Sequence, residues 1–331
     1  MSTENKGPVV VLDYDFGDVD IERSLVESAG FELVAAQCKT EEDVVAAAHD
    51  AIGVLTQYAE VKEKAISGLQ RCQVIARYGT GVDTVDVAAA TKRGIRVTNA
   101  PNDWCADEVA DHAVALLLTL ARKLFAYDRA TRRGSWSWQD GRPIHRMRGA
   151  TLGLLSFGAI ARGVGRRMAS FGVHVTAHDP FVDPNEVRAA GATLVSFDEL
   201  LVSSDYVVIQ APLTSETRGL IGERELRRMK PTAILVNTAR GPIVDDNALH
   251  RALTQGWIAG AGLDDIAEEP AKRSDWKSTS PLFSLENVVI SPHAAYYSEE
   301  SLEFVRRFAA NEVVRVLSGQ EPSSPVNLMA A

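Results

Sequence analysis

The chain has 331 residues, of which 46% are hydrophobic and 24% are charged, and its formal net charge is −9. This length is enough for about two globular domains, each with its own core. The acidic balance argues against a nucleic-acid-binding surface, which needs a concentration of positive charge.

The three cysteines, Cys38, Cys72 and Cys105, are widely spaced and form no CxxC pair. This pattern predicts neither a disulfide framework nor a metal site, and it favours a reducing compartment. The polar start of the chain has no signal-peptide character, and the longest apolar run, 113–118, is too short to cross a membrane. We therefore expect a cytoplasmic protein that contacts no membrane.

Short apolar runs alternate with helix-like segments over the first hundred residues. The expected strands are 9–12, 33–36, 52–55, 74–76 and 95–98, and the expected helices are 21–29, 41–49, 62–68 and 85–93. This alternation of strands and helices is typical of a parallel sheet.

The pattern changes after Pro101. Asp103 is expected to cap a long helix that continues to about Tyr127, because apolar residues recur there at helical spacing. A second alternating series follows, with strands expected at 152–155, 174–178, 206–210, 234–237, 260–263 and 288–291, and a closing helix at about 301–317. The sequence therefore predicts an α/β fold with two doubly wound parallel-sheet units, at about 1–100 and 101–297.

The segment Gly153 to Ala161 runs from a strand through a turn into a helix, which is the place of a dinucleotide-binding GxGxxG motif. Only the middle glycine, Gly158, is present, since Ser156 and Ala161 occupy the other two positions. The middle position matters most because the backbone there must approach a pyrophosphate closely. A serine at the first position is energetically less favourable than glycine if the turn needs a positive φ there.

Asp179 follows the next expected strand, twenty-one residues after Gly158. A carboxylate at this place accepts hydrogen bonds from a ribose and repels a 2′-phosphate, which favours NAD over NADP. Asp179 could also be only a turn residue before Pro180. The combination with the glycine turn makes cofactor binding the better interpretation.

Three polar residues follow three other expected strands: Arg240, Glu269 and His293. In an open parallel sheet the ligand crevice lies outside the carboxyl ends of the strands, so these residues could converge there. Arg240 offers a rigid fork for a substrate carboxylate. His293 could exchange a proton with a carbonyl or hydroxyl oxygen, and Glu269 would orient its ring. The alternatives are a surface salt bridge for Arg240, a loop charge for Glu269 and a structural role for His293.

Several motifs now give a specific resemblance. They are Arg77–Asp83 (RYGTGVD), Gln210–Leu213 (QAPL), Asn237–Gly241 (NTARG), the Glu269-Pro270 pair and His293–Glu299 (HAAYYSE). Over essentially its whole length the chain resembles the D-isomer-specific 2-hydroxyacid dehydrogenases, and within them the C-terminal-binding protein branch.

The resemblance implies an NAD-dependent oxidoreductase acting on a small 2-hydroxy or 2-keto acid, with Arg240, Glu269 and His293 as the catalytic trio. It implies a flavodoxin-like substrate domain at 1–100 and 298–331, a Rossmann NAD-binding domain at 101–297, and a cleft between them. A homodimer formed through the NAD-binding domain is also implied.

The resemblance further implies two sets of contacts. Substrate contacts would come from Arg240, His293 and the loop residues Arg77, Tyr78, Gly79, Thr80 and Gly81. Cofactor contacts would come from Thr80, Phe157, Gly158, Ala159, Ile160, Asp179, Ala211, Pro212, Thr217, Thr238, Ala239, Asp264 and Ala295.

This chain departs from the family pattern at the phosphate turn, where Ser156, Ala159 and Ala161 replace two glycines and a basic residue. One cationic phosphate contact is missing, although Arg162 could replace it. We therefore expect weaker NAD binding than is usual for this fold. Tyr296 replaces the tryptophan of the branch, so the preferred acid could differ too.

Other functions are compatible with these residues. One is an NADH-sensing scaffold for partner peptides, as in the C-terminal-binding proteins. Another is a relative that oxidises a non-carbon substrate such as phosphite, and a third is a dehydrogenase acting on phosphoglycerate.

Overall fold

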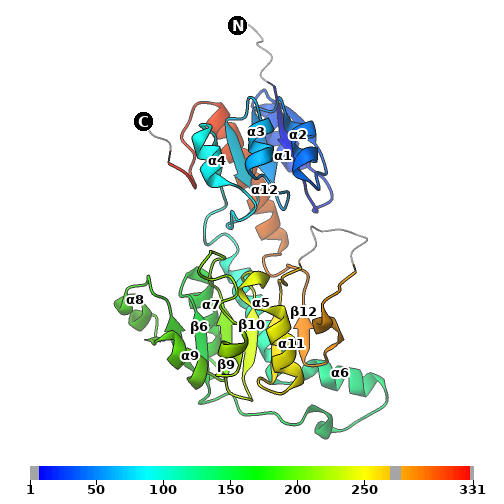
Figure 1. Ribbon diagram of the computed structural model, residues 1–331, viewed down its shortest axis with the longest axis vertical. Coiled ribbons are helices and arrows are strands. Elements are labelled where there is room, and N and C mark those ends of the chain that lie inside the picture. Colours follow the sequence, from blue (N-terminus) through cyan, green and yellow to red (C-terminus); the bar gives the residue numbers. More distant parts are fainter. Residues whose placement is uncertain (1–6, 269–276, 329–331) are drawn as a thin grey trace. The chain divides into compact units, whose positions relative to one another are not determined.

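The computed structural model describes residues 7–268 and 277–328. Their contacts divide them into two units (Figure 1). The first contains the chain up to Trp104 and again from Ser298, and the second contains the described residues between Cys105 and Tyr297. The predicted residue Glu269 lies outside the described residues.

The first unit is built on a five-stranded parallel sheet with the order β2-β1-β3-β4-β5, which is the flavodoxin-like order. Its strands are β1 (Pro8–Val11), β2 (Glu32–Ala35), β3 (Gly53–Thr56), β4 (Val74–Arg77) and β5 (Arg96–Thr98). All five strands were predicted, with ends that differ by at most one residue.

Helices cover both faces of this sheet. They are α1 (Asp20–Ser28), α2 (Glu41–Ala48), α3 (Glu63–Gly68), α4 (Val87–Lys92) and α12 (Glu299–Leu317). Apolar side chains of α2, α3 and α4 form one core with the sheet, and those of α1 and α12 form the other. At Gly53 a Cβ atom would lie 2.8 Å from the Val313 side chain, so this glycine allows α12 to pack closely on β3.

The second unit is built on a seven-stranded parallel sheet with the order β12-β11-β10-β9-β6-β7-β8. The strands are β6 (Thr151–Leu155), β7 (His174–His178), β8 (Thr193–Leu194), β9 (Tyr206–Ile209), β10 (Ile234–Asn237), β11 (Gly260–Leu263) and β12 (Val288–Ile290). The six strands from β8 at one edge to β11 have the spatial order of a Rossmann fold, and β12 extends the sheet beyond β11. The sequence did not reveal β8, which has only two residues.

Seven α-helices are described in this unit. They are α5 (Ala106–Ala121), α6 (Leu124–Arg132), α7 (Ala159–Ala169), α8 (Pro184–Ala189), α9 (Phe197–Ser203), α10 (Glu223–Leu226) and α11 (Asp246–Thr254), with short 3₁₀ turns η1 (Trp138–Gly141), η2 (Gly241–Ile243) and η3 (Pro281–Ser284). Residues of α5, α7 and α8 form the core on one face of the sheet, and residues of α9, α10 and α11 form the core on the other.

The predicted single helix from Asp103 to Tyr127 is wrong in two respects. The helix begins at Ala106 without a side-chain cap, so Asp103 does not cap it. It also ends at Ala121, because Lys123 adopts a left-handed conformation (φ 53°) before α6 begins. A periodic apolar pattern does not reveal such a local break.

Among the described residues, no helix has both the length and the apolar character that a membrane crossing requires.

Candidate functional site

The loops that carry most of the predicted site residues lie at one edge of the seven-stranded sheet. They follow β6, β7, β9, β10, β11 and β12, and since the strands are parallel, all these loops leave the same edge. The chain goes from β6 outward through β7 to β8 and then returns to β9 on the other side of β6. This reversal is the topological switch point at which doubly wound sheets bind ligands.

The turn after β6 has the shape of a phosphate-binding turn. Ser156 has a φ of 80°, in the region that favours glycine, and Gly158 is the N-cap of α7. A Cβ atom at Gly158 would meet no protein atom within 4 Å, so this glycine leaves open space beside the start of the helix. The first amides of a helix have no partner within the helix, and helix starts of this kind hold anions. The turn therefore fits a dinucleotide pyrophosphate.

Asp179, which follows β7, is attached to this turn. Its Oδ2 accepts hydrogen bonds from the Phe157 amide (2.9 Å) and the Ser156 hydroxyl (3.3 Å), and its Oδ1 accepts one from the Phe181 amide (2.9 Å). The half-buried carboxylate retains further acceptor capacity, so it could still receive ribose hydroxyls. Arg162 lies over the Phe157 ring and pairs with Glu186 at 3.4 Å.

Arg240 follows β10, and its turn is fixed by a buried asparagine. Asn237 is fully buried, donates a hydrogen bond to the Arg240 carbonyl (2.9 Å) and accepts one from the Ala239 amide (3.1 Å). The neighbouring Thr238 hydroxyl accepts a hydrogen bond from Gln210 at the end of β9 (2.6 Å). These bonds determine where the Arg240 side chain leaves the sheet.

The Arg240 loop lies directly against the loop after β11. At Gly241 a Cβ atom would lie only 2.1 Å from the Ile266 carbonyl carbon, so only glycine permits this approach. The loops after β10 and β11 therefore hold each other in place.

His293 follows β12 and is held by Asp264, which follows β11. The His293 amide donates to the Asp264 carbonyl (2.7 Å), and His293 has a φ of 50°. The buried Asp264 carboxylate accepts hydrogen bonds from the Ser291 hydroxyl (2.6 Å) and from the amides of Ala294 (3.0 Å) and Ala295 (2.9 Å). One carboxylate thus fixes the backbone on both sides of the histidine.

Two residues that contact His293 or its supporting loops were not assigned a role in the site from the sequence. Asp265 Oδ2 lies 3.8 Å from His293 Nδ1, and its side chain is almost completely buried. His112, on α5, lies 2.8 Å from the Ser291 hydroxyl through Nε2. Asp265 could have been recognised as the second residue of an Asp-Asp pair at a strand end. The sequence offered no signal that His112 would meet Ser291, which is 179 residues away.

Glu268, the carboxylate before the predicted Glu269, contacts residues 278–280. Glu268 accepts hydrogen bonds from the Ser278 hydroxyl (2.5 Å), the Thr279 hydroxyl (2.7 Å) and the Ser280 amide (2.9 Å). These bonds, with that from Ser278 the largest influence, lower the pKa of Glu268 to about 2.

The predicted residues Ala211, Pro212 and Thr217 lie in the loop after β9. There the Thr217 hydroxyl donates to the Pro212 carbonyl at 2.6 Å. Among the described residues, the second unit therefore brings Arg240, His293, Asp264 and the loops after β6, β7 and β9 to one sheet edge.

The predicted loop 77–81 belongs to the first unit, at the carboxyl end of β4. Tyr78 is buried and packs edge-on against Phe16, so its side chain belongs to the core. The Thr80 hydroxyl accepts a hydrogen bond from the Trp104 indole (3.1 Å) and donates one to the Pro101 carbonyl (3.2 Å). At Gly79, where φ is 149°, a Cβ atom would clash with the Arg77 guanidinium.

A neighbouring loop of the first unit is organised by Asp13, which the sequence did not single out. Its carboxylate accepts hydrogen bonds from the amides of Gln57 (2.8 Å), Tyr58 (2.6 Å) and Ala59 (3.0 Å). Asp13 thereby fixes the loop that follows β3, at the same sheet edge as the 77–81 loop.

Comparison with known proteins gives consistent matches. Residues 114–295 match the family described as "D-isomer specific 2-hydroxyacid dehydrogenase, NAD binding domain". A glyoxylate reductase from Korarchaeum cryptofilum is 41% identical over 272 residues, which cover 81% of this chain and 79% of that protein. A D-3-phosphoglycerate dehydrogenase from Archaeoglobus fulgidus is 38% identical over 280 residues, which cover 85% of this chain but 52% of that protein.

Solved structures show the same similarity. The TT0316 protein from Thermus thermophilus has a TM-score of 0.86 and 32% identity, and the match covers 97% of this chain and 100% of that one. A D-lactate dehydrogenase from Aquifex aeolicus, complexed with NAD and lactic acid, has a TM-score of 0.87 and 27% identity, with coverage of 97% and 100%.

Proposed function

The chain belongs to the D-isomer-specific 2-hydroxyacid dehydrogenase family, and from this membership we propose that it reduces glyoxylate, or a 2-keto acid of similar size, with NADH. That it is an NAD-dependent 2-hydroxyacid dehydrogenase follows from the family and its relatives. The choice of glyoxylate is supported by the names of several relatives at 37–41% identity. These relatives favour neither a peptide-binding scaffold nor phosphite oxidation.

One observation carries the assignment of roles. His293 and Arg240 follow β12 and β10, which lie on the same side of the switch point with β11 between them. Asp264, after β11, binds the backbone next to His293, and Gly241, next to Arg240, lies directly against the loop after β11. The bound nicotinamide supplies a hydride for the keto carbon. His293 would donate a proton to the keto oxygen, and a neighbouring carboxylate would orient its ring.

Arg240 would bind the carboxylate of the acid. A guanidinium presents two parallel N–H donors that match two carboxylate oxygens, and this geometry also places the adjacent carbonyl group. The backbone amides of the loop 77–81 would provide further substrate contacts. We retain Glu269 as the carboxylate partner of His293, as the family resemblance implies, with Asp265 as a second carboxylate close to the ring.

NAD would lie along the loops after β6, β7 and β9. The turn at Phe157, Gly158, Ala159 and Ile160 would hold the pyrophosphate, and Asp179 would accept the adenosine ribose hydroxyls. Ala211, Pro212 and Thr217 would line the adenosine side. The nicotinamide side would be lined by Thr80, Thr238, Ala239, Asp264 and Ala295.

We also propose that the first unit is the substrate domain, that the second unit is the NAD-binding domain, and that the protein is a cytoplasmic homodimer. Trp136, Trp138, Leu124 and Phe125 on α6 and the following segment are exposed, and such an apolar surface is suited to contact with a second copy. The three cysteines are free thiols, which fits a reducing compartment.

The direct test is NADH oxidation with glyoxylate, pyruvate and hydroxypyruvate, measured as kcat/KM for each acid. Glyoxylate should give the highest value. If no 2-keto acid supports NADH oxidation, the proposed reaction is wrong, whereas preference for a larger acid would reject glyoxylate alone.

A further inference from the structure

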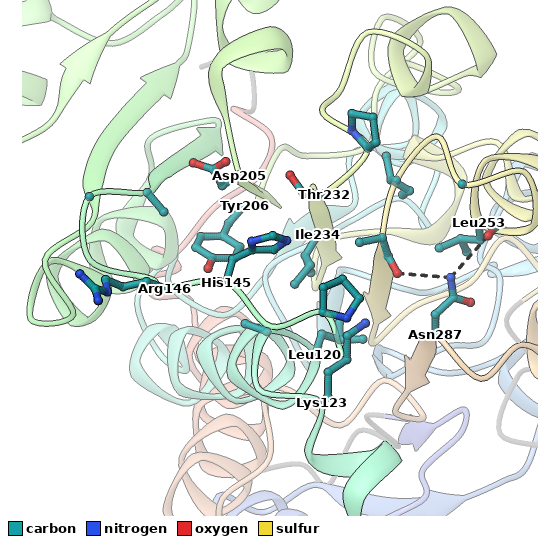
Figure 2. A pocket seen from close by; sticks show the side chains of 18 of the residues that line it. Leu120, Lys123, His145, Arg146, Asp205, Tyr206, Thr232, Ile234, Leu253 and Asn287 are labelled. Carbon is teal, nitrogen blue, oxygen red and sulfur yellow. Dashed lines mark hydrogen bonds between the residues drawn. The ribbon is translucent and has the colours of Figure 1, made fainter. Parts of the chain in front are cut away.

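The helix α5 crosses one face of the seven-stranded sheet from the carboxyl edge to the amino edge. Leu120, near its end, lines a hollow at the amino edge together with Ile234, the first residue of β10, and Asn287, which precedes β12 (Figure 2). His112 precedes Leu120 by eight residues, or about 12 Å of helix. A four-residue strand such as β11 spans a similar distance, about 13 Å. The helix therefore carries His112 to the edge at which the candidate active site lies.

Two glycines of β11 allow α5 to approach the sheet closely. Gly260 and Gly262 are two residues apart, so they share one face of the strand. A Cβ atom at Gly262 would lie 3.0 Å from Leu116 Cβ. A Cβ atom at Gly260 would lie 3.3 Å from Leu120 Cδ2. His112, Leu116 and Leu120 recur at intervals of four, so they share one face of the helix. The packing of the two leucines therefore holds His112 beside the ends of β11 and β12.

His112, Ser291 and Asp264 form a chain of hydrogen bonds at this edge. His112 Nε2 lies 2.8 Å from Ser291 Oγ, which lies 2.6 Å from Asp264 Oδ1. A serine hydroxyl has one hydrogen and a carboxylate has none to donate, so Ser291 donates to Asp264. Ser291 can then only accept a hydrogen bond from the histidine. His112 therefore carries a hydrogen on Nε2 and is the donor at the start of the chain.

The chain ends on the carboxylate that holds the backbone around His293. Asp264 is 2% exposed, and it also accepts hydrogen bonds from the two amides that follow His293. His112 Nε2 lies 3.6 Å from the same carboxylate, and the His112 side chain is 30% exposed. Hydrogen bonds in a chain polarise one another, so a donor to Ser291 strengthens the bond from Ser291 to Asp264. The orientation of Asp264, and with it the backbone next to His293, therefore depends on His112.

We propose that His112 is a positioning residue for the reduction of the keto acid, acting through Ser291 and Asp264 on the backbone that carries His293. This inference rests on the proposed function, because it takes His293 as the proton donor. In this role His112 exchanges no proton with the substrate. It keeps the His293 imidazole at the place from which a proton reaches the keto oxygen, and a small displacement of such a group lowers the rate strongly.

The variants H112L and H112Q separate the hydrogen-bond donor from the volume of the side chain. Leucine and glutamine are both good helix formers, but only glutamine can donate from a place near Nε2. H112L should lower kcat for NADH oxidation with glyoxylate by about tenfold, as expected for one lost charge-assisted link, and H112Q should recover most of this loss. KM for glyoxylate should change little, because Asn237 holds the Arg240 turn separately. A wild-type kcat in H112L, or equal losses in both variants, would overturn the proposal.

A double-mutant cycle with S291A distinguishes this role from a general loss of stability. Because His112 acts through Ser291, the double variant H112L/S291A should have the same kcat as S291A alone. The matched control is H49L, which replaces an exposed histidine at the end of α2 in the first unit and should keep the wild-type kcat. Additive losses of kcat from H112L and S291A would show that the two residues act independently, which would overturn the proposal.

Two spectroscopic measurements test the chain of hydrogen bonds without any reaction. In long-range ¹H–¹⁵N NMR spectra of the full chain labelled with ¹⁵N-histidine, the signal that is missing in H112Q belongs to His112, and its Nε2 should be protonated. Hydrogen exchange of the Ala294 and Ala295 amides should be faster in H112L than in the wild type. An unprotonated Nε2 or unchanged exchange would overturn the positioning role. If both results are as expected but no 2-keto acid supports NADH oxidation, the proposed reaction is wrong and the positioning of the His293 backbone still holds.

Discussion

The Ser156 hydroxyl lies 3.3 Å from the Asp179 carboxylate and donates a hydrogen bond to it. Ser156 occupies the place of the first glycine in the dinucleotide-binding motif and has the positive φ, 80°, for which that glycine is normally needed. The unfavourable backbone conformation of Ser156 is thus accompanied by a hydrogen bond that glycine could not make, to Asp179, the residue proposed to bind the ribose. Asp179 also accepts the Phe157 amide, so the phosphate turn and the end of β7 form one hydrogen-bonded unit.

The variants S156G and S156A separate the two effects at this position. Both remove the hydroxyl, but only glycine also relieves the left-handed backbone, which costs other residues about 1–2 kcal/mol. Glycine loses part of that advantage, about 0.5–1 kcal/mol, through its greater freedom in the unfolded chain. We expect S156G to be the more stable variant in urea denaturation. Equal stability of the two would show that the turn relaxes when serine is lost.

Calorimetric titration of the same variants with NAD⁺ tests the expected weak cofactor binding. The wild type should bind NAD⁺ less tightly than is usual for this fold. S156A should bind it still more weakly, because Asp179 loses one of the groups that orient it. Submicromolar binding by the wild type would contradict the expectation drawn from the altered glycine motif.

Replacement of Asp179 should change the preference between the two dinucleotides. D179A should weaken NAD⁺ binding by about 1–3 kcal/mol, since hydrogen bonds to a charged group are lost. It should improve NADP⁺ binding, because a carboxylate no longer repels the 2′-phosphate. D179N is the control, because its amide oxygen can still accept the Phe157 amide. An unchanged ratio of the two dissociation constants in D179A would exclude Asp179 from the ribose site.

Removal of the Asp264 carboxylate should destabilise the protein and displace His293. D264A leaves three donors without their acceptor: the buried Ala295 amide and the partly buried Ser291 hydroxyl and Ala294 amide. Each such donor costs about 1–3 kcal/mol. We expect a large fall in the urea midpoint and in kcat. S291A, which removes one of these donors, should have a much smaller effect on both, and similar effects of the two variants would contradict the role given to Asp264.

The buried Cys38 and the partly buried Cys72 should resist thiol reagents in the folded protein. Burial raises the pKa of the Cys38 thiol to about 11 and that of Cys72 to about 12, so little reactive thiolate exists near neutral pH. The folded protein should react slowly with Ellman's reagent and the urea-unfolded protein rapidly. Fast reaction of both thiols in the folded state would contradict this prediction.

The same pKa shifts predict a loss of stability in alkali. A raised thiol pKa means that the folded state holds its proton more firmly than the unfolded state. This contribution is complete below the unfolded pKa, about 8.5, and is lost as the pH rises toward the folded values. The urea midpoint should therefore fall between about pH 9 and pH 11, and C38A should reduce that fall.

The sequence predicted the parts of this fold that depend on repeated patterns. Alternation of apolar strands and helices gave both parallel sheets, and the strand ends placed Arg240 and His293 at one edge. It did not predict the break at Lys123, which depends on one backbone conformation, or β8, which is too short for a periodic pattern. Nor did it predict the contacts of Asp264 with Ser291 and of Asp13 with the loop after β3. Such contacts join residues that are distant in the chain, so they are determined by the packing of whole strands.

The most direct test of the proposed mechanism is the effect of H293Q on NADH oxidation with glyoxylate, measured together with the dissociation constant of NADH. General acid–base catalysis contributes about 10²–10⁴-fold, so kcat should fall by that factor while NADH binding is nearly unchanged. If H293Q keeps a kcat close to that of the wild type, His293 is not the proton donor and the proposed mechanism is wrong.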